Sequence, residues 1–361
     1  MKYEYKDSLS KNIIFSFILV LSFFLILELL LRASGLVTVK VLKFPNRETY
    51  KKIVGTFSPN QDFVSIETFK SKLPYNVHIN SQGLRGKEFQ LKKTPDTFRI
   101  LCLGDSYTFS CFVDDEETFP AKLEEFLNKK NGREKIEVIN GGVSGYTIVD
   151  ELSYLQEKGI RVSPDLVIVG FVMNDVSDLT SKKSCRESQK NAREYWSSSP
   201  IEPLREKLVD TAIYNLFRSI KAYVKYKTKT GETIAEAPIF NIITENYNKE
   251  LLKLWDRYEE PLVKMRDYLN LRKIKLVLVI FPIDDQVNKG FSDKPQRFLK
   301  EMGKRLGIEV CDLLPQFKKE SKKKISLFLA PYDGHPAKYG YKITSFEVSK
   351  FLKDKKLVPG E

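Results

Sequence analysis

The chain has 361 residues, of which 42% are hydrophobic and 30% are charged, a balance typical of a folded protein rather than a disordered one. The formal net charge is +13, but the lysines are scattered among glutamates and aspartates, so we expect a solvated Lys-rich surface and no nucleic-acid binding. The four cysteines show no C-x-x-C spacing and the only histidines are His78 and His335, which argues against a zinc site built from paired Cys and His ligands.

Residues 13–31 form the apolar run IIFSFILVLSFFLILELLL, which is interrupted only by two serines and Glu28. At about 1.5 Å per residue, a helix of this length just spans a bilayer core roughly 30 Å thick. The run is longer than the apolar part of a usual signal peptide and no clear small-x-small cleavage motif follows it, which favours an uncleaved anchor over a cleaved signal. Glu28 lies one turn before Arg32, so the two can pair at the level of the lipid headgroups.

The charges that flank this span do not decide its orientation. Three lysines precede it, and four Lys or Arg residues follow it within residues 32–47. A short N-terminal tail inside and a large domain outside is the simpler topology. We therefore expect a single-pass membrane protein with an extracytoplasmic domain.

Residues 35–95 lack a clean hydrophobic period and contain several turn signals, so we interpret them as a juxtamembrane and lead-in segment. The predicted organisation then has three parts. A short tail and transmembrane helix occupy 1–34, the lead-in segment occupies 35–95, and a folded domain occupies 96–357 with an insertion at about 176–270.

Short apolar runs alternate with helical patterns through the folded domain. Strands are predicted at 98–103, 136–139, 166–171, 274–281 and 308–311, and helices at 118–128 and 148–158. This alternation indicates an α/β fold with a parallel sheet covered on both faces. In such sheets the ligand lies at the carboxyl ends of the strands.

About a hundred residues separate the third and fourth predicted strands, which exceeds an ordinary connection. Within this insertion, residues 181–200 are predicted as a polar, irregular loop. Residues 251–269 keep helical spacing, with a kink or restart expected at Pro261. The insertion fits a lid or substrate-binding cap as well as it fits a plain structural excursion.

Polar residues follow the first three predicted strands. Ser106 comes after Gly104 at the end of the first strand, where a glycine lets the backbone turn and point the serine into the crevice. Gly145 lies in the turn after the second strand, where it either serves a tight turn or exposes a backbone N–H to the same crevice. Asn174 follows the third strand, where it either caps a helix or directs its amide toward an oxyanion.

His335 lies two residues after Asp333 in a loop that precedes a helical stretch. A lone histidine is more often structural, but this chain has only two, and one of them lies beside an aspartate. A serine hydroxyl needs a base near neutral pH, and the base needs an acidic partner that fixes its tautomer. Together with Ser106 and the candidate oxyanion donors, these residues fit one mechanism.

The order of four short blocks, GDSYT, SGYT, MND and DGHP, resembles that of the SGNH, or GDSL-type, serine hydrolases. The lead-in INSQGLRG and the N-terminal span are similar to membrane-tethered bacterial members. The resemblance covers roughly residues 75–355, the insertion excepted, and implies a three-layer α/β/α sandwich with a flavodoxin-like sheet of about five parallel strands. It also implies Ser106 as nucleophile, His335 as base, and Ser106, Gly145 and Asn174 as oxyanion donors.

Two positions depart from the family pattern. Many members have a glycine two residues beyond the Thr of the first block, where this chain has Ser110. Many also place the catalytic Asp three residues before the His, a position that Tyr332 occupies here and at which it cannot act as the acid. Asp333, only two residues before His335, is therefore assigned as the acid partner.

The sequence thus predicts an ester hydrolase that needs no cofactor and no metal. Its substrate would be a small-molecule or glycan ester, such as an acylated envelope glycan or lipid, and its other partner the membrane. Two alternatives stay open. An O-acyltransferase would pass the acyl group to a sugar hydroxyl, and a non-catalytic SGNH-fold binding protein would explain the unusual spacing of Asp333. The oligomeric state is left open.

Overall fold

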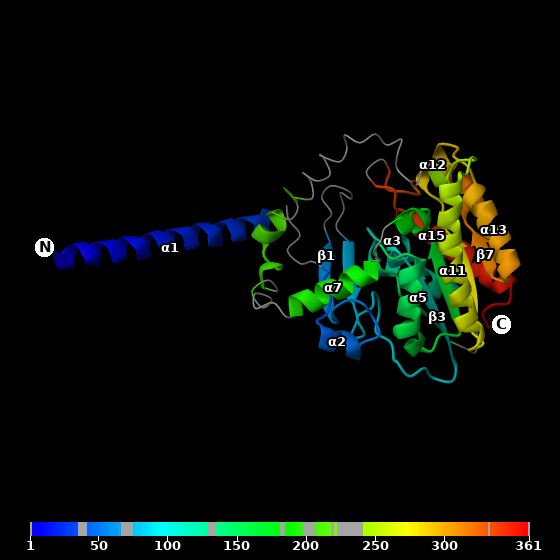
Figure 1. Cartoon of the computed structure of the whole chain (residues 1–361), viewed down its shortest axis with the longest axis horizontal. Helices are drawn as coiled ribbons and strands as arrows, with labels where there is room; N and C mark the ends of the chain where they lie inside the picture. Colours follow the sequence, from blue (N-terminus) through cyan, green and yellow to red (C-terminus); the bar gives the residue numbers. More distant parts are fainter. Residues whose placement is uncertain are drawn as a thin grey trace.

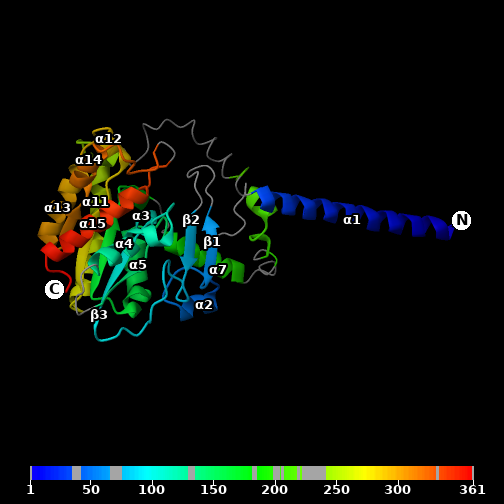
Figure 2. The ribbon, with the colours of Figure 1, turned by 180° about the vertical axis from the view of Figure 1, so that it is seen from behind.

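A long N-terminal helix projects from an α/β body, and the chain ends on the far side of that body (Figure 1). The computed structural model describes residues 2–34, 42–65, 75–128, 135–180, 185–197, 204, 207–217, 220–221, 241–330 and 333–359. Figure 2 shows the same arrangement from behind.

Five parallel strands form the central sheet. They are β3 (Thr97–Gly104), β4 (Lys135–Asn140), β5 (Leu166–Phe171), β6 (Lys275–Ile280) and β7 (Glu309–Asp312). Their order across the sheet is β4-β3-β5-β6-β7. Counted along the chain this is the 2-1-3-4-5 order of flavodoxin-like sheets, in which a crevice opens between the carboxyl ends of the first and third strands, here β3 and β5. Every residue of β5 is buried, as expected for a strand covered on both faces.

Helices cover both faces of the sheet. The larger helices of the body are α4 (Phe119–Leu127), α5 (Ile148–Glu157), α11 (Lys249–Asn270), α13 (Lys294–Leu306), α14 (Leu314–Ser321) and α15 (Lys338–Asp354). Helices α5, α11 and α13 lie over the face seen in Figure 1, and α4 and α15 pack together over the face seen in Figure 2. The predicted three-layer α/β/α sandwich is therefore confirmed, and each predicted strand agrees with the structure to within one residue at each end.

Shorter elements fill the connections between these layers. They are α3 (Ser106–Phe109), α6 (Asn174–Ser177), α7 (Cys185–Ser197) and α12 (Asp284–Asn288), with 3-10 turns at Asp115–Glu117, Gly159–Val162 and Asp178–Thr180. Helix α7 contradicts the predicted irregular loop. Its first residues are held by polar contacts, such as the Arg186 backbone N–H that donates to Asp150 Oδ1 at 2.8 Å, and polar contacts leave no apolar period in the sequence.

A kink or a restart was expected at Pro261, and because helix α11 continues past the proline, the restart is wrong. Buried apolar residues lie on both sides of the proline, with Tyr258 before it and Leu262 after it, and they pack the whole helix against the body. Tertiary packing of this kind outweighs the lost backbone hydrogen bond. Much of the predicted insertion between α7 and α11, on which a lid or cap role would depend, lies outside the described residues.

The lead-in segment packs on the body. Its described elements are α2 (Arg47–Lys52) and the antiparallel strands β1 (Gln61–Ser65) and β2 (Tyr75–Ile79). The buried Lys158 Nζ donates to the carbonyl oxygens of Tyr50 and, at 2.9 Å, of Ile53. The Tyr154 hydroxyl donates to the Val54 carbonyl at 3.0 Å. Two residues at the C-terminal end of α5 thereby fix the lead-in to the sandwich.

Helix α1 (Lys2–Ser34) is the N-terminal helix that projects from the body (Figure 1). Its stretch Leu9–Ser34 is long and apolar enough to cross a bilayer, and its apolar side chains are largely exposed. The same properties fit a signal sequence near the N-terminus. By length and composition, α1 is a candidate membrane span.

Candidate active site

The turn between β3 and α3 presents Ser106 at the carboxyl edge of the sheet. Gly104 has φ +150°, and a Cβ on it would lie 2.1 Å from Thr108 Oγ1. A Cβ on Gly170, in the neighbouring β5, would lie 2.4 Å from the same oxygen. Thr108 therefore fills space that two glycines leave between adjacent strands, and α3 is drawn tightly onto the strand ends.

Ser106 and His335 are hydrogen-bonded although 229 positions separate them, with Ser106 Oγ 2.7 Å from His335 Nε2. On the other side of the ring, His335 Nδ1 is hydrogen-bonded to Asp333 Oδ1. A carboxylate can only accept, so Nδ1 carries the ring proton and Nε2 is left to accept the serine proton. Asp105 Oδ2 is the other acceptor near the hydroxyl, at the longer distance of 3.4 Å.

The two-residue spacing of Asp333 and His335 is accommodated by a local turn. Asp333 Oδ1 also accepts the backbone N–H of His335 at 2.9 Å, the contact by which an aspartate folds the chain back on itself. That turn places the carboxylate beside the imidazole of the residue two positions on. Tyr332, at the more usual family position, lies outside the described residues.

Asp105 connects the serine turn to Asn174, the first residue of α6. Its Oδ2 accepts from Asn174 Nδ2 at 2.9 Å, and its Oδ1 accepts the Tyr107 backbone N–H at 2.8 Å. Burial raises the pKa of Asp105, although the hydrogen bonds from Asn174 and Tyr107 oppose that rise. Sequence reasoning assigned no role to Asp105 beyond its place in the GDSYT block. In the structure its contact with Asn174 links the ends of β3 and β5.

Gly145 lies in the turn after β4, exposed and with φ +80°. A Cβ on it would meet only Cys185 Sγ, at 3.7 Å, so the backbone conformation rather than crowding favours glycine here. The turn lies against α3, because a Cβ on Gly142 would lie 2.2 Å from the Phe109 nitrogen. The structure thus joins Ser106, His335, Asp333 and Asn174 through hydrogen bonds that include Asp105. Among the described residues, Gly145 is not part of this hydrogen-bonded set.

Two aromatic residues that sequence reasoning missed hold the histidine loop. The Tyr107 hydroxyl donates to the Gly334 carbonyl at 2.7 Å, and its ring lies 4.9 Å from that of His335. Burial, together with the Asp105 and Asp333 carboxylates, raises the pKa of Tyr107 well above its usual value, so the hydroxyl stays a donor. The signal for Tyr107 was its place beside the serine in GDSYT.

Phe112 packs edge-on against His335, with ring centroids 5.1 Å apart, and has φ +69°. Bulky residues rarely adopt this conformation, and such strain persists only where the surroundings impose it. No sequence pattern pointed to Phe112.

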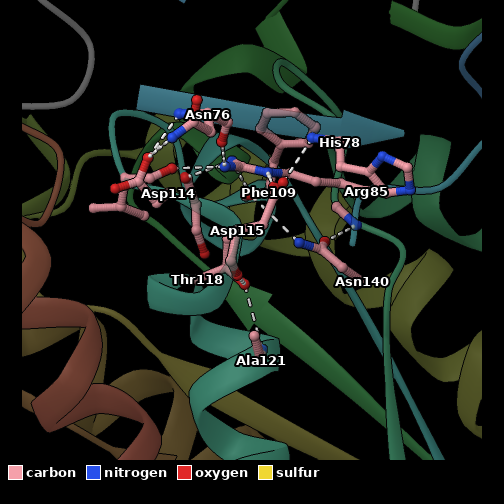
Figure 3. A network of polar contacts seen from close by, with 12 residues as sticks. Asn76, His78, Arg85, Phe109, Asp114, Asp115, Thr118, Ala121 and Asn140 are labelled. Atoms are coloured by element: carbon pink, nitrogen blue, oxygen red, sulfur yellow. Dashed lines mark hydrogen bonds and ion pairs between the residues drawn. The ribbon is translucent and has the colours of Figure 1, made fainter. Parts of the chain in front are cut away.

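Arg85 of the lead-in binds the chain on both sides of Phe112, and Figure 3 shows its contact with Asp115. Its buried guanidinium donates to the carbonyl oxygens of Ser110 at 2.8 Å and Val113 at 2.6 Å, and to Asp115 Oδ1 at 2.7 Å. A buried arginine with several backbone acceptors fixes the path of the segment that supplies them. Through Arg85, the lead-in therefore supports the segment whose Phe112 ring packs against the imidazole of His335.

The second histidine lies outside this constellation. His78 is on β2, where its Nδ1 lies 2.6 Å from Asp62 Oδ1, an exposed carboxylate. Its backbone N–H donates to Asp115 Oδ2 at 2.6 Å, so it contributes to the support around Arg85 through its main chain (Figure 3). His335 is thus the histidine that contacts the serine.

Comparison with known proteins gives one family and a set of similar folds. Residues 102–343, about two thirds of the chain, match the GDSL-like lipase/acylhydrolase family. A member of the lipolytic protein G-D-S-L family from Veillonella parvula is 12% identical over 70% of this chain and 97% of its own, with a TM-score of 0.41. An acetylxylan esterase from Geobacillus stearothermophilus is 18% identical over 71% of this chain and 92% of its own, with a TM-score of 0.40. No curated protein sequence matches significantly.

The family match includes the serine turn, the turn after β4 and the start of α6, and it extends into α15 beyond His335. It therefore covers the four sequence blocks that meet at this edge of the sheet. The chain belongs to the GDSL-like lipase/acylhydrolase family and is an ester hydrolase.

Proposed function

We propose that the protein is a membrane-anchored serine esterase in which Ser106 is the nucleophile, His335 the general base and Asp333 the carboxylate that orients the base. The observation that carries this proposal is the continuous set of hydrogen bonds from Ser106 Oγ through the imidazole to Asp333. The three side chains have the connectivity of a serine-hydrolase triad, and the tautomer set by Asp333 leaves Nε2 free to take the serine proton.

In the proposed reaction, Ser106 Oγ attacks the ester carbonyl carbon while its proton moves to His335 Nε2. The imidazolium that forms is stabilised by Asp333 and then gives its proton to the leaving alkoxide as the ester C–O bond breaks. In the second half, water attacks the acyl-serine and loses its proton to His335. His335 then gives this proton to Ser106 Oγ as the acyl C–O bond breaks, which releases the acid and regenerates the serine.

The oxyanion would be sheltered by the backbone N–H groups of Ser106 and Gly145 and by the Asn174 amide. Ser106 is the first residue of α3, where backbone N–H groups have no acceptor within the helix. The Asn174 amide donates one N–H to Asp105, which orients the group, and a side-chain hydrogen bond also joins the amide to Asp178. Loss of one such donor typically raises the barrier by about 2.7–4 kcal/mol.

Anchoring through α1 is supported by contacts between its last turns and the body. Glu28 accepts the backbone N–H groups of Ala212 at 2.8 Å and Ile213 at 3.0 Å. Cleavage of a signal peptide would remove these contacts and leave two N–H groups without their acceptor, which favours a retained helix. With the domain outside the cell membrane, the proposed substrate is an ester of an envelope glycan or lipid.

Replacement of the nucleophile tests the mechanism. Ser106→Ala should lower kcat/KM for p-nitrophenyl acetate by about 10⁴-fold or more and abolish labelling by a fluorophosphonate probe, whereas Asp333→Asn should lower it by about 10²–10⁴-fold. The matched control is Ser153→Ala on the exposed face of α5, which should leave both readouts unchanged. Full activity and labelling in Ser106→Ala would overturn the assignment. Mass spectrometry of products, with and without added polysaccharide, separates hydrolysis from acyl transfer.

A further inference from the structure

The end of α1 is held by a short stretch of the insertion. Glu28 accepts two backbone N–H groups there, and its Oε1 also lies 2.7 Å from Arg32 Nε. Arg32 in turn donates to the Asp210 carbonyl at 2.8 Å. Residues 210–213 are therefore bound to the last two turns of the apolar helix by three hydrogen bonds, two to Glu28 and one from Arg32.

The position of Glu28 along the membrane normal also sets the position of the residues that bind it. Glu28 lies three residues before Leu31, where the apolar run ends, so its Cα is about 5 Å inside that end at about 1.5 Å per residue. When α1 spans a bilayer, the backbone of Ala212 and Ile213 must lie at the same level, at the boundary between hydrocarbon and headgroups. The stretch that contains Ala212 and Ile213 would therefore contact the lipid.

The neighbouring side chains are suited to that position. The interfacial segment, by which we mean residues 207–217 together with Leu204 and Ile220, exposes five large apolar side chains: Leu204, Leu208, Tyr214, Phe217 and Ile220. Phe217 is 66% exposed and Leu204 is 59% exposed, values close to those of the lipid-spanning part of α1. Figures 1 and 2 both show this part of the chain beside the body end of α1.

The charge of the adjoining sequence matches an anionic lipid surface. Residues 218–229 contain five Lys or Arg, two Tyr and no acidic residue. Juxtamembrane basic clusters are attracted to anionic headgroups, and tyrosines are enriched at membrane–water interfaces. Lys207 and Lys221 are exposed and flank the stretch from Leu208 to Ile220 in the sequence.

We propose that the interfacial segment is a second membrane contact, in which its exposed apolar side chains enter the lipid interface beside α1 and the exposed Lys207 and Lys221 meet anionic headgroups. The proposal rests on the proposed retention of α1 as a membrane anchor. Two contacts joined by Glu28 hold the body in a set orientation on the bilayer, which a single helix alone would not do.

Tryptophan quenching by brominated lipid tests this contact in the full-length chain. Three variants, Phe17→Trp in α1, Phe217→Trp in the interfacial segment and Leu271→Trp after α11, are reconstituted in vesicles of phosphatidylcholine and phosphatidylglycerol at 3:1. The parent chain supplies the background of its two native tryptophans. Leu271 is 84% exposed and directly follows α11, which Figure 1 shows away from α1, so it is the matched control.

We expect brominated phosphatidylcholine to quench Phe17→Trp and Phe217→Trp but not Leu271→Trp, and the emission of Phe217→Trp to shift to shorter wavelength. Leu208→Trp provides a second position in the segment with the same expectation. Quenching at Phe17 without quenching at Phe217 or Leu208 would overturn this proposal while the anchor stands. An unquenched Phe17→Trp would overturn the anchor and this proposal with it. Unchanged esterase activity establishes that each variant is folded.

Discussion

Ser110 shows how this chain tolerates a side chain where many family members have glycine. The residue ends α3 with φ 62°, a conformation that glycine adopts without strain. Ser110 is fully buried, and its Oγ accepts the backbone N–H of Phe119 at 2.9 Å, at the start of α4. That hydrogen bond offsets part of the conformational cost and connects the serine turn to the next helix.

Tyr107 offers a test of how the histidine loop is positioned. Tyr107→Phe removes the hydroxyl that donates to the Gly334 carbonyl and leaves the ring against His335. We expect kcat for p-nitrophenyl acetate to fall about three- to tenfold with KM nearly unchanged, because a neutral hydrogen bond is worth about 0.5–1.5 kcal/mol. Steady-state kinetics give both constants.

The matched control for Tyr107 is Tyr154→Phe. Tyr154 is also buried and also donates to a backbone carbonyl, that of Val54, but it lies on α5 in contact with the lead-in. Its kcat should equal that of the parent chain. Equal kinetic losses in the two variants would show that a general loss of stability, and not the position of His335, causes the effect.

The proposed reacting residues could be named from the sequence, but the residues that support them could not. Ser106, Asn174 and His335 stand in short blocks whose residue types have a chemical reason to occur together. Arg85 and Phe112 act through contacts that exist only after distant strands and loops have met, and neither stands in a repeating pattern. Asp333 could be named, but the turn that makes its spacing workable is a matter of side-chain geometry.

Among the elements, the strands were predicted best because their environment leaves a strong pattern. A strand buried on both faces is a continuous apolar run, and turn residues bound it at each end. Helix α7 was missed because a mainly polar helix held by side-chain contacts has no such signature. Helix α11 was found from its apolar spacing, but the effect of Pro261 depended on packing that the sequence does not display.

A group of acidic and phenolic side chains is buried where α5, α6 and α11 meet. Neither carboxylate oxygen of Glu151 has a hydrogen-bond partner among the described residues, and the same holds for Asp175 Oδ1 and the Tyr258 hydroxyl. Burial, with the nearby carboxylates of Asp105 and Asp150, raises the pKa of Glu151 well above its usual value. Burial and the charge of Glu151 raise the pKa of Asp175 in the same direction.

This raised pKa predicts a fall in stability with rising pH. Between the unfolded and folded pKa values of Glu151, the folded chain holds a proton that the unfolded chain has released, so the free energy of unfolding decreases as pH rises through that range. Glu151→Gln removes the titration. We expect the variant to match the parent chain near pH 4 and to be more stable at pH 8.

Urea unfolding at several pH values measures this difference. The control is Glu250→Gln, which changes an exposed carboxylate at the start of α11 and should leave the pH profile as it is in the parent chain. A parent-minus-Glu151→Gln difference that stays constant between pH 4 and pH 8 would contradict the buried titration.

For the whole molecule, the association of lead-in and sandwich sets how the anchor relates to the site. Arg85 and Lys158 bind main-chain oxygens across the boundary between residues 35–95 and 96–357 that the sequence predicted. Both cations are buried, and removal of either would leave several carbonyl groups without donors. The lead-in segment is thus built into the body.

Retention of α1 can be tested with epitope tags at both ends of the chain. We expect one full-length band that carries both tags and stays in the membrane fraction after extraction with alkaline carbonate. We expect this because Glu28 accepts the backbone N–H groups of Ala212 and Ile213. A signal sequence that is cleaved off would have no need of such contacts with the body. A shorter band that carries only the C-terminal tag would show that the helix is a signal sequence.

The turn at Asp333 has a consequence for how such a site could arise or be transferred. Because one carboxylate oxygen binds both the main chain and the ring of His335, the acid and the base are aligned within three consecutive residues. Asp333 and His335 are therefore aligned with each other by contacts within their own loop, without a second loop. Grafted onto another sheet edge beside a serine, the pair would bring its own tautomer control, and only its docking distance would have to be designed.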